Sequence, residues 1–283
     1  MIPDAKSPAV NLRSFAIEAP DLTYSDLRSV SPVHIKYLDH MGVEATFSIP
    51  IKLGGELWGL VACHNLVPKK IDFEQRKMCV RLAKAYGMGV FTYSSGRKLQ
   101  SIDRIDRQVS ALMKTLVQSS NLFSGIKKNQ DIFLMLMKAD GFVAFFNDEI
   151  ITMGKVPDDP QVLKVDKWFK QLFPESTLYT DHLVDYFPDE KFSHHMSGMF
   201  AIKIEPKHES SIRMFWFRTE LPQTVNWGGN PDKPMMENDG VAVLSPRRSF
   251  EKWTQTKTGY SLSWGFEEKT IAAKIRSSIF LWF

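Results

Sequence analysis

Residues 44–65, EATFSIPIKLGGELWGLVACHN, carry the clearest local fold signal in the chain. Two runs rich in apolar and β-branched residues are separated by Gly54-Gly55. Paired glycines can adopt the positive φ angles of a tight turn, so the pattern predicts a β-hairpin. With a strict two-residue turn, Ala45 is expected to lie opposite His64, which then projects away from the side chains of Thr46 and Ser48.

A long helical pattern follows the hairpin. Asp72 and Gln75 have the spacing of a capping box, which predicts a helix start. Gly87, Gly89 and Gly96 weaken the middle of the pattern and predict a kink or a break there. The apolar spacing from Ile102 to Leu116 alternates between three and four residues, as in a coiled-coil seam. That spacing suits packing against a neighbouring domain and dimerisation equally well.

The second half of the chain alternates helix-like and strand-like runs. Helices are expected at DIFLMLMKA and VDKWFKQLF, and strands at GFVAFF, SGMFAIKI and IRMFWFRTE. Adjacent antiparallel strands mixed with helices predict an α+β fold, with sheets flanked by helices. The stretch from residue 221 to 253 is rich in Gly and Pro, yet contains Trp227, Trp253 and the run GVAVL. We therefore expect an ordered excursion with a functional role.

Composition narrows the functional classes. The chain has 283 residues, 43% apolar and 24% charged, which suits two ordinary domains. A net charge of +4 is too small and too evenly spread to indicate nucleic-acid binding, and the doublet Lys69-Lys70 is interpreted as solvated surface. Cys63 and Cys79 lack the spacing of a disulfide framework or a zinc site and fit a reducing cytoplasm. The N-terminus has no long apolar run, so we expect neither a signal peptide nor a membrane span.

The termini and the polar clusters support further expectations. The C-terminal run IFLWF is so apolar that we expect the chain to be a fragment of a longer protein. P-loop, GxGxxG and HExxH motifs are absent from the sequence. The pair His194-His195 and the cluster of Asp181, His182 and Asp185 are better explained by surface and capping roles than by metal or acid–base chemistry.

A second polar cluster is more suggestive of binding. Arginine can clamp a carboxylate, hydroxyl groups donate hydrogen bonds, and histidine can donate, accept or stack. Together they suit an apolar ligand with acidic arms, although a histidine in such apolar surroundings is also typical of an ordinary core. The candidate residues are Arg28, Ser31, His34, Tyr37, Thr46, Ser48 and His64.

Residues 27–65, LRSVSPVHIKYLDHMGVEATFSIPIKLGGELWGLVACHN, resemble the chromophore-pocket segment of the GAF domain in phytochromes. The later half resembles the phytochrome-specific PHY domain, and the resemblance extends from about residue 20 to about residue 275. Its motifs stand in family order: LVQSSNLFSGI, ADGFVAFF, SGMFAIKI, FWFRTE, VNWGGNPDKP, PRRSFEKW and SWGFEE.

The resemblance implies a role for each pocket residue. His34 is expected to pack on the inner pyrroles of a bilin, and Tyr37 to border the ring that isomerises. Arg28 is expected to pair with one propionate, and the hydroxyl groups of Thr46 and Ser48 with the other. The resemblance gives His64 a hydrogen bond to the carbonyl of the isomerising ring, which requires a bulge or a different loop length in the hairpin.

The resemblance also identifies residues 222–265 as the tongue, a hairpin that reaches back over the chromophore. Its PRxSF motif contains Arg247, in the position that meets an aspartate near the chromophore, and Ser249. In SWGFEE the acidic spacing after the tryptophan departs from the usual pattern.

Departures elsewhere indicate the type of pigment. Plant and cyanobacterial phytochromes carry the bilin-bearing cysteine immediately before the SPxH histidine, where this chain has Val33. The bacterial type uses biliverdin and a cysteine far upstream in a PAS domain. We expect this chain to lack the PAS domain, the first half of GAF and the attachment cysteine, because Cys63 has no support in that role.

The expected organisation is a partial GAF domain over 1–95, a linking helix over 96–125 and a PHY domain over 126–283. The implied function is red/far-red light sensing, with no enzyme activity in this chain. By resemblance the full-length parent is a cytoplasmic sensor histidine kinase that acts on a response regulator and dimerises through helices, without nucleic acid or membrane. The alternatives are a pigment-free GAF-type small-molecule sensor or interaction module, and a metal hydrolase built around His194-His195.

Overall fold

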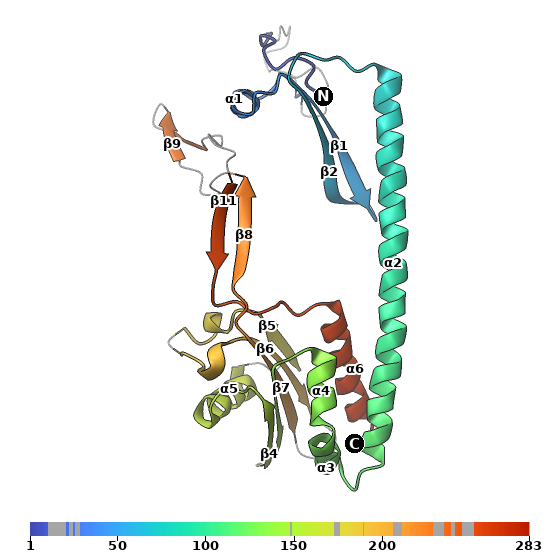
Figure 1. The fold of residues 1–283 in the computed structure, drawn as a ribbon, viewed down its shortest axis with the longest axis vertical. Coiled ribbons are helices and arrows are strands. Elements are labelled where there is room, and N and C mark those ends of the chain that lie inside the picture. Colours follow the sequence, from blue (N-terminus) through green and yellow to red (C-terminus); the bar gives the residue numbers. More distant parts are fainter. Residues whose placement is uncertain are drawn as a thin grey trace. The chain divides into compact units, whose positions relative to one another are not determined.

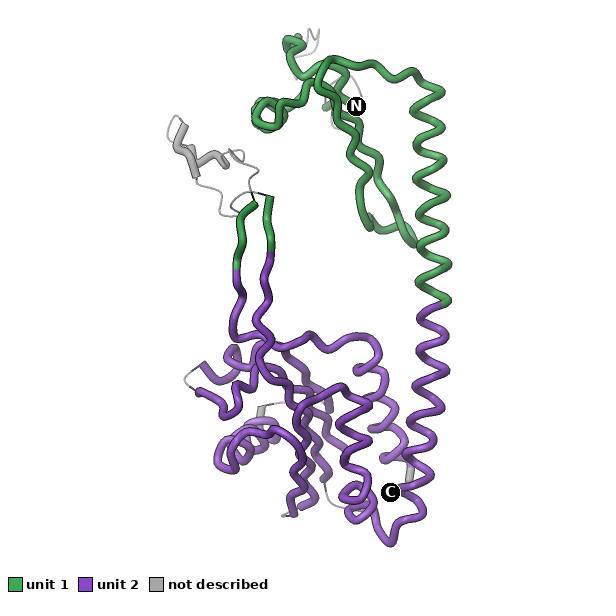
Figure 2. Tube along the Cα trace, in the orientation of Figure 1, with its two compact units in different colours: residues 1–96, 226–255 green, residues 97–225, 256–283 purple. Residues whose placement is uncertain are grey.

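The computed structural model describes residues 1–10, 21–22, 25, 29–147, 149–172, 176–188, 190–205, 211–228, 235–238, 241–244 and 252–282. The chain divides into two compact units, residues 1–96 with 226–255 and residues 97–225 with 256–283 (Figures 1 and 2). Each unit combines helices with antiparallel strands, which confirms the expected α+β class.

Unit 1 contains the predicted hairpin. Strands β1 (Ala45–Leu53) and β2 (Glu56–Asn65) pair antiparallel, and both turn glycines have positive φ, 60° at Gly54 and 95° at Gly55. A short helix that the sequence did not predict, α1 (Pro32–His40), precedes them. Its Leu38 is fully buried against Ala5 and Val43, and this cluster fixes the helix beside the hairpin.

Helix α2 (Phe73–Val117) starts where the capping pattern predicted, because the Asp72 carboxylate accepts a hydrogen bond from the Gln75 amide at 2.7 Å. It then continues for 45 residues, so the predicted kink at its glycines is wrong. Each glycine costs only about 1 kcal/mol in a helix, a cost that the helix of 45 residues tolerates. A Cβ at Gly87 would lie 3.0 Å from the Lys52 carbonyl oxygen, so glycine lets the helix approach the hairpin closely.

Unit 2 is built on a five-stranded antiparallel sheet in the order β4-β3-β7-β6-β5 (Figure 1). The strands expected at GFVAFF, SGMFAIKI and IRMFWFRTE are confirmed as β3, β6 and β7, whereas the edge strands β4 and β5 were not predicted. The bounds are β3 Gly141–Phe146, β4 Glu149–Gly154, β5 Thr177–Thr180, β6 Met196–Ile204 and β7 Ile212–Thr219.

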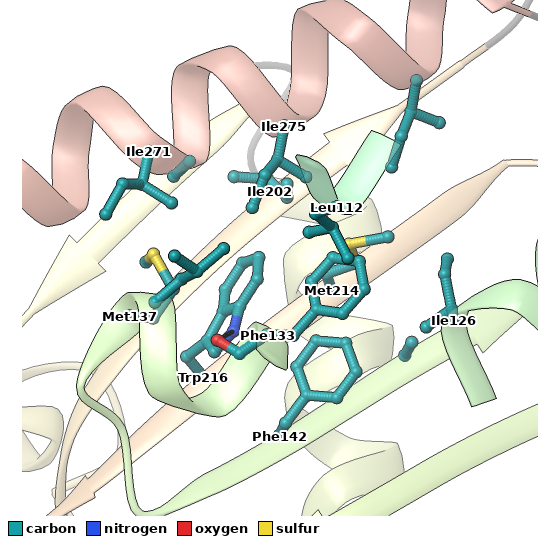
Figure 3. Packing of buried hydrophobic residues seen from close by; sticks show 14 of the residues in the cluster. Leu112, Ile126, Phe133, Met137, Phe142, Ile202, Met214, Trp216, Ile271 and Ile275 are labelled. Carbon is teal, nitrogen blue, oxygen red and sulfur yellow. Dashed lines mark hydrogen bonds between the residues drawn. The ribbon is translucent and has the colours of Figure 1, made fainter. Parts of the chain in front are cut away.

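Both faces of this sheet are buried, which explains the long apolar runs in β6 and β7. One face packs on α4 (Gln130–Met137), α3 (Leu122–Lys128) and α6 (Phe266–Trp282) around Phe133, Phe142 and Trp216 (Figure 3). The Trp216 indole donates to the Phe133 carbonyl at 3.1 Å. The other face packs on α5 (Asp159–Leu172), and the 3₁₀ turns η1 (Leu183–Asp185) and η2 (Ser193–His195) follow β5.

The heptad-like seam of α2 is used inside unit 2. Ile105, Val109, Leu112 and Leu116 are buried in the same cluster as Ile271, Ile275 and Ile279 of α6. Of the two uses that the spacing allowed, packing within the chain is therefore the one observed for these side chains.

The Gly- and Pro-rich stretch is ordered where it is described. Strands β8 (Gln223–Gly228) and β11 (Lys252–Lys257) pair with each other, and β9 (Met235–Asn238) pairs with β10 (Val241–Leu244). The predicted tongue residues Arg247 and Ser249 lie outside the described residues. Across the described ranges, no helix is long and apolar enough to cross a lipid bilayer.

Candidate functional site

The predicted binding residues that the structure describes all lie in unit 1, on α1 and the β1–β2 hairpin. Ser31 is the exposed N-cap residue of α1, and His34 and Tyr37 lie on that helix. The strands carry the other candidates, Thr46 and Ser48 on β1 and His64 on β2. Arg28 lies outside the described residues.

Helix α1 brings two of the predicted rings together. His34 and Tyr37 are three residues apart, a spacing that places both on one side of a helix. Their ring centroids are 6.0 Å apart with an interplanar angle of 20°. Tyr37 is half-buried against the core around Leu38, whereas His34 is exposed. The helix is thus anchored by its apolar side and presents His34 outward.

The hairpin register differs from the strict two-residue expectation and corrects it. Ile51 pairs with Gly59 and Lys52 pairs with Leu57, so Trp58 is an extra, bulged residue on β2. Beyond the bulge, Thr46 rather than Ala45 lies opposite His64. Because facing partners share a side of the sheet, Thr46, Ser48 and His64 lie on one face.

The bulged residue makes a contact outside the strands. The Trp58 ring lies 6.4 Å from the Tyr86 ring of α2, with an angle of 53° between the planes. An aromatic pair at this separation gains packing energy. The extra residue that aligns the candidate hydroxyl and imidazole groups thus also contacts the helix.

A small pocket opens at the end of the hairpin. It has a volume of about 140 Å³ and is lined by Thr46, His64, Cys63, Asn65 and Lys69, among others. Small-molecule sites commonly occupy about 300–1,000 Å³, so this pocket suits one polar arm of a ligand. Lys69 adds a cation beside the hydroxyl and imidazole groups, a combination that attracts a carboxylate.

The outer face of the hairpin can support a larger, apolar ligand body. Leu60 pairs with Pro50, which lies two residues from Ser48 on β1, so Leu60 is on the same face as Ser48 and His64. Leu60 is 61% exposed. An exposed apolar side chain therefore lies beside the hydroxyl and imidazole groups on this face.

Lys69 is the residue that sequence reasoning missed. It had been interpreted as solvated surface within the doublet Lys69-Lys70. The structure brings it to the pocket because its backbone amide donates to the Pro3 carbonyl at 2.9 Å, which ties the chain after β2 to the N-terminal segment. A basic doublet that closely follows a strand bearing candidate ligand residues was the available signal.

The other polar clusters lie in unit 2. The His182 Nδ1 lies 2.8 Å from an Asp185 oxygen, and the His182 ring stacks on Tyr260 at 4.1 Å. His194 and His195 are exposed at η2. In the part of the chain that is described, no three His, Cys, Asp or Glu side chains are grouped to hold a metal ion.

Comparison with protein families gives two matches. Residues 105–282 match the model described as "Phytochrome region", and residues 9–87 match the model of the GAF domain. The first match alone covers more than half of the chain.

Individual relatives agree with these matches. The chain is 35% identical over 285 residues to cyanobacterial phytochrome B from Nostoc sp., covering 99% of this chain and 38% of the relative. It is 31% identical over 260 residues to a bacteriophytochrome from Pseudomonas aeruginosa, covering 92% of this chain and 35% of the relative. The chain thus spans little more than a third of the length of these proteins.

Two solved structures share the fold. The crystal structure of a bacteriophytochrome from R. palustris superposes with a TM-score of 0.77 at 30% identity, covering 98% of this chain and 56% of that one. The photosensory core module of a Stigmatella aurantiaca phytochrome superposes with a TM-score of 0.75 at 29% identity, covering 99% of this chain and 56% of the module.

Proposed function

Because the chain belongs to the phytochrome family, we propose that it is part of a red/far-red light sensor and holds a bilin against the β1–β2 hairpin and α1. The observation that carries the proposal is the bulge at Trp58, which aligns Thr46, Ser48 and His64 on one face. When bound, the bilin supplies light absorption and isomerisation about one methine bridge.

The chain's own residues bind and orient the pigment in this proposal. Thr46 and Ser48 donate to one propionate, and Lys69 adds a cation at the same end of the hairpin. His64 hydrogen-bonds the carbonyl of the isomerising ring, while His34 and Tyr37 pack against the pyrroles. Arg28 pairs with the second propionate, and Ser31 contributes a further hydroxyl group.

We assign biliverdin as the bilin. Val33 occupies the position before His34 where a cysteine would attach the pigment. Cys63 is exposed and lines the small pocket. It directly precedes His64 on β2, and we assign it no attachment role. Binding through this chain is therefore non-covalent, and the affinity depends on the polar contacts of the hairpin.

The proposed organisation is a partial GAF domain over 1–95, a linking helix over 96–125 and a PHY domain over 126–283 with the tongue at about 222–265. In the tongue, Arg247 and Ser249 contact the chromophore region. Light-driven changes in the pigment's hydrogen bonds bias the tongue between two arrangements, and the helices pass that bias onward.

The proposed output is that of a cytoplasmic two-component receptor, a histidine kinase that acts on a response regulator. The chain itself is proposed to sense and to carry no enzyme activity. Dimerisation through helices is supported by exposed apolar side chains along the first half of α2. These are Met78, Leu82, Tyr86, Met88 and Phe91, each more than half exposed.

The first experiment is an absorption spectrum after biliverdin is added, recorded before and after red illumination. It compares this chain with a chimera that also carries the additional photosensory residues of the R. palustris relative. A red band that photoconverts is expected, strongest in the chimera. His64→Ala is expected to impair photoconversion, whereas His194→Ala, an exposed histidine of unit 2, is expected to leave it unchanged.

The absence of a red band in both proteins would remove the light-sensing proposal. The second candidate, a pigment-free GAF-type sensor of a small molecule, would then stand. It is favoured by one observation, the volume of about 140 Å³ of the pocket beside Thr46 and Lys69, which suits a small anionic metabolite better than a tetrapyrrole. One measurement separates an interaction module from such a sensor. For an interaction module, no small anion raises the melting temperature of unit 1.

A further inference from the structure

Arg218, near the end of β7, is a buried polar centre that the proposed light-sensing site does not use. Its side chain is 3% exposed. The guanidinium donates hydrogen bonds to four backbone carbonyls. Two belong to the end of α4, Met137 at 2.9 Å and Lys138 at 3.1 Å, and two follow β11, Leu262 and Ser263, both at 3.0 Å.

Two further contacts fix the residues that lead into α6. The guanidinium carbon of Arg218 lies 3.8 Å from the centre of the Trp264 ring, and Nη2 lies 3.5 Å from a Glu268 oxygen. The Trp264 indole donates to the Thr180 carbonyl at 2.9 Å. The other Glu268 oxygen accepts from the Gly265 amide at 2.9 Å, so the first turn of α6 is tied to the same centre.

The neighbouring carboxylate extends this centre to α2. Lys138 lies 2.9 Å from one Glu267 oxygen and 3.2 Å from a Glu268 oxygen. The other Glu267 oxygen accepts from the Ser101 hydroxyl at 2.9 Å and also pairs with Arg104. The first turn of α6 is therefore held between α2, the end of α4 and the segment that follows β11.

We propose that Arg218 is a positioning residue that couples the β8–β11 hairpin to α6. A buried guanidinium cannot lose its partners without a large cost, because its charge would be left uncompensated away from water. When residues 258–265 shift with the hairpin, Arg218 retains its partners only if the first turn of α6 shifts too. This proposal rests on the proposed function in one respect: the light-driven change of the pigment is the stimulus that moves the hairpin.

The same strand supplies a matched control. Arg213 of β7 is also buried, at 3% side-chain exposure, but its contacts are with Asp166 of α5 and the Phe145 ring. It faces the core that lies on the opposite side of the sheet, because positions 213 and 218 differ by an odd number of residues. Arg213→Lys therefore removes a comparable buried guanidinium without touching residues 258–265.

The test measures amide hydrogen exchange in the first turns of α6, residues 266–274, in the full chain without pigment. Thr256→Pro perturbs β11, because proline lacks an amide hydrogen and fixes φ. In the wild-type background this change is expected to raise exchange in 266–274 by about tenfold, the size of one charge-assisted hydrogen bond.

Arg218→Lys keeps the charge and loses the planar fork of donors. In that background Thr256→Pro is expected to change exchange in 266–274 by less than about twofold, because a lysine cannot hold both partner segments. In the Arg213→Lys background the response remains near tenfold. A purely structural role would raise basal exchange but leave the response to Thr256→Pro intact.

The proposal is overturned if Thr256→Pro leaves α6 unchanged while Arg218 is present, or if the response is equal in the wild-type and Arg218→Lys backgrounds. Should Arg218→Lys unfold unit 2, Glu268→Gln is used in its place, with the same expected loss of response and Asp166→Asn as its control. Since no pigment is present, failure of this test leaves the biliverdin experiment untouched, and the reverse also holds.

Discussion

Single residues decide how closely strands of unit 2 approach each other. Gly141 and Gly154 face each other across β3 and β4. A Cβ added at Gly141 would lie 1.7 Å from the Lys155 carbonyl oxygen, and one at Gly154 would lie 2.3 Å from the Asp140 carbonyl oxygen. Both partners are backbone atoms, which cannot move aside as the end of a flexible side chain can.

Gly141→Ala is therefore expected to destabilise unit 2 by about 2 kcal/mol or more, the cost of overpacking a well-packed site. Urea unfolding followed by circular dichroism measures the change. The control is Gly89→Ala in α2, where an added Cβ meets no atom of the described residues within 4 Å. That variant is expected to gain about 0.5–1 kcal/mol. Equal effects of the two substitutions would contradict the steric argument.

At the scale of the element, the β-bulge sets which face of β2 carries each side chain. The Thr46 backbone bonds to Ile2 in both directions at 2.8 Å, so Thr46 and His64 form a non-hydrogen-bonded pair across β1 and β2. Such pairs bring the two Cα atoms to about 4.5 Å. A cross-strand Hα–Hα contact between Thr46 and His64 is therefore expected by NMR.

Deleting Trp58 removes the extra residue and is expected to keep that contact, because Ile51 and Gly59 then pair in an uninterrupted ladder that leaves Thr46 opposite His64. Biliverdin binding should be retained in parallel, since the imidazole stays on the same face as the two hydroxyl groups. Trp58→Ala keeps the extra residue and is expected to keep the contact. If the contact is lost on deletion, the register is fixed by something other than residue count.

The first turn of α6 makes the stability of unit 2 depend on pH. The hydrogen bond from Lys138 lowers the pKa of Glu267 below its ordinary value of 4.5, and the bond to Glu267 raises the pKa of Lys138 above 10.5. The Glu267 contribution is therefore complete above pH 4.5 and is lost as the pH falls through the lowered value. The Lys138 contribution is complete below pH 10.5 and is lost as the pH rises through the raised value.

Melting temperatures measured from pH 3 to pH 7 are expected to fall more steeply on acidification in the wild type than in Glu267→Gln. The difference should shrink at high salt, because Lys138 is more than half exposed and its charge is screened. Parallel curves for the two proteins would show that Glu267 does not contribute through its charge.

At the scale of the whole molecule, the sequence was informative wherever local pattern and packing agree. The turn at Gly54-Gly55 and the buried strands β6 and β7 were predictable because their patterns extend over many residues. The seam from Ile102 to Leu116 was ambiguous, since the same spacing serves packing against a neighbouring domain or dimerisation. The glycines of α2 suggested a break, yet the helix continues through all three of them.

The candidate site was predictable in its residue types and not in its geometry. The resemblance required Thr46 and His64 to share a face, whereas the turn alone predicted the opposite. The difference lies in Trp58, whose packing on Tyr86 joins residues 28 positions apart, outside the reach of a local pattern. Lys69 was missed for the same reason, because its backbone bond to Pro3 is a long-range contact.

The two units have separate cores of different size, and this predicts how the molecule unfolds. The cluster around Leu38 in unit 1 contains three buried residues, whereas the clusters on the two faces of the unit 2 sheet are far larger. Less buried apolar area means less stabilisation per residue, so calorimetry is expected to show two transitions with unit 1 melting first.

Core substitutions assign the transitions. Leu38→Ala is expected to lower only the first transition, and Phe133→Ala only the second, each by about 2–5 kcal/mol of unfolding free energy. Both side chains are fully buried, so the two variants are matched in burial. A single transition that responds to both substitutions would instead mean that α2, which runs through both units, makes them unfold together. Stability added to unit 1 by a bound ligand would in that case also protect unit 2, because one cooperative unit shares any gain in free energy.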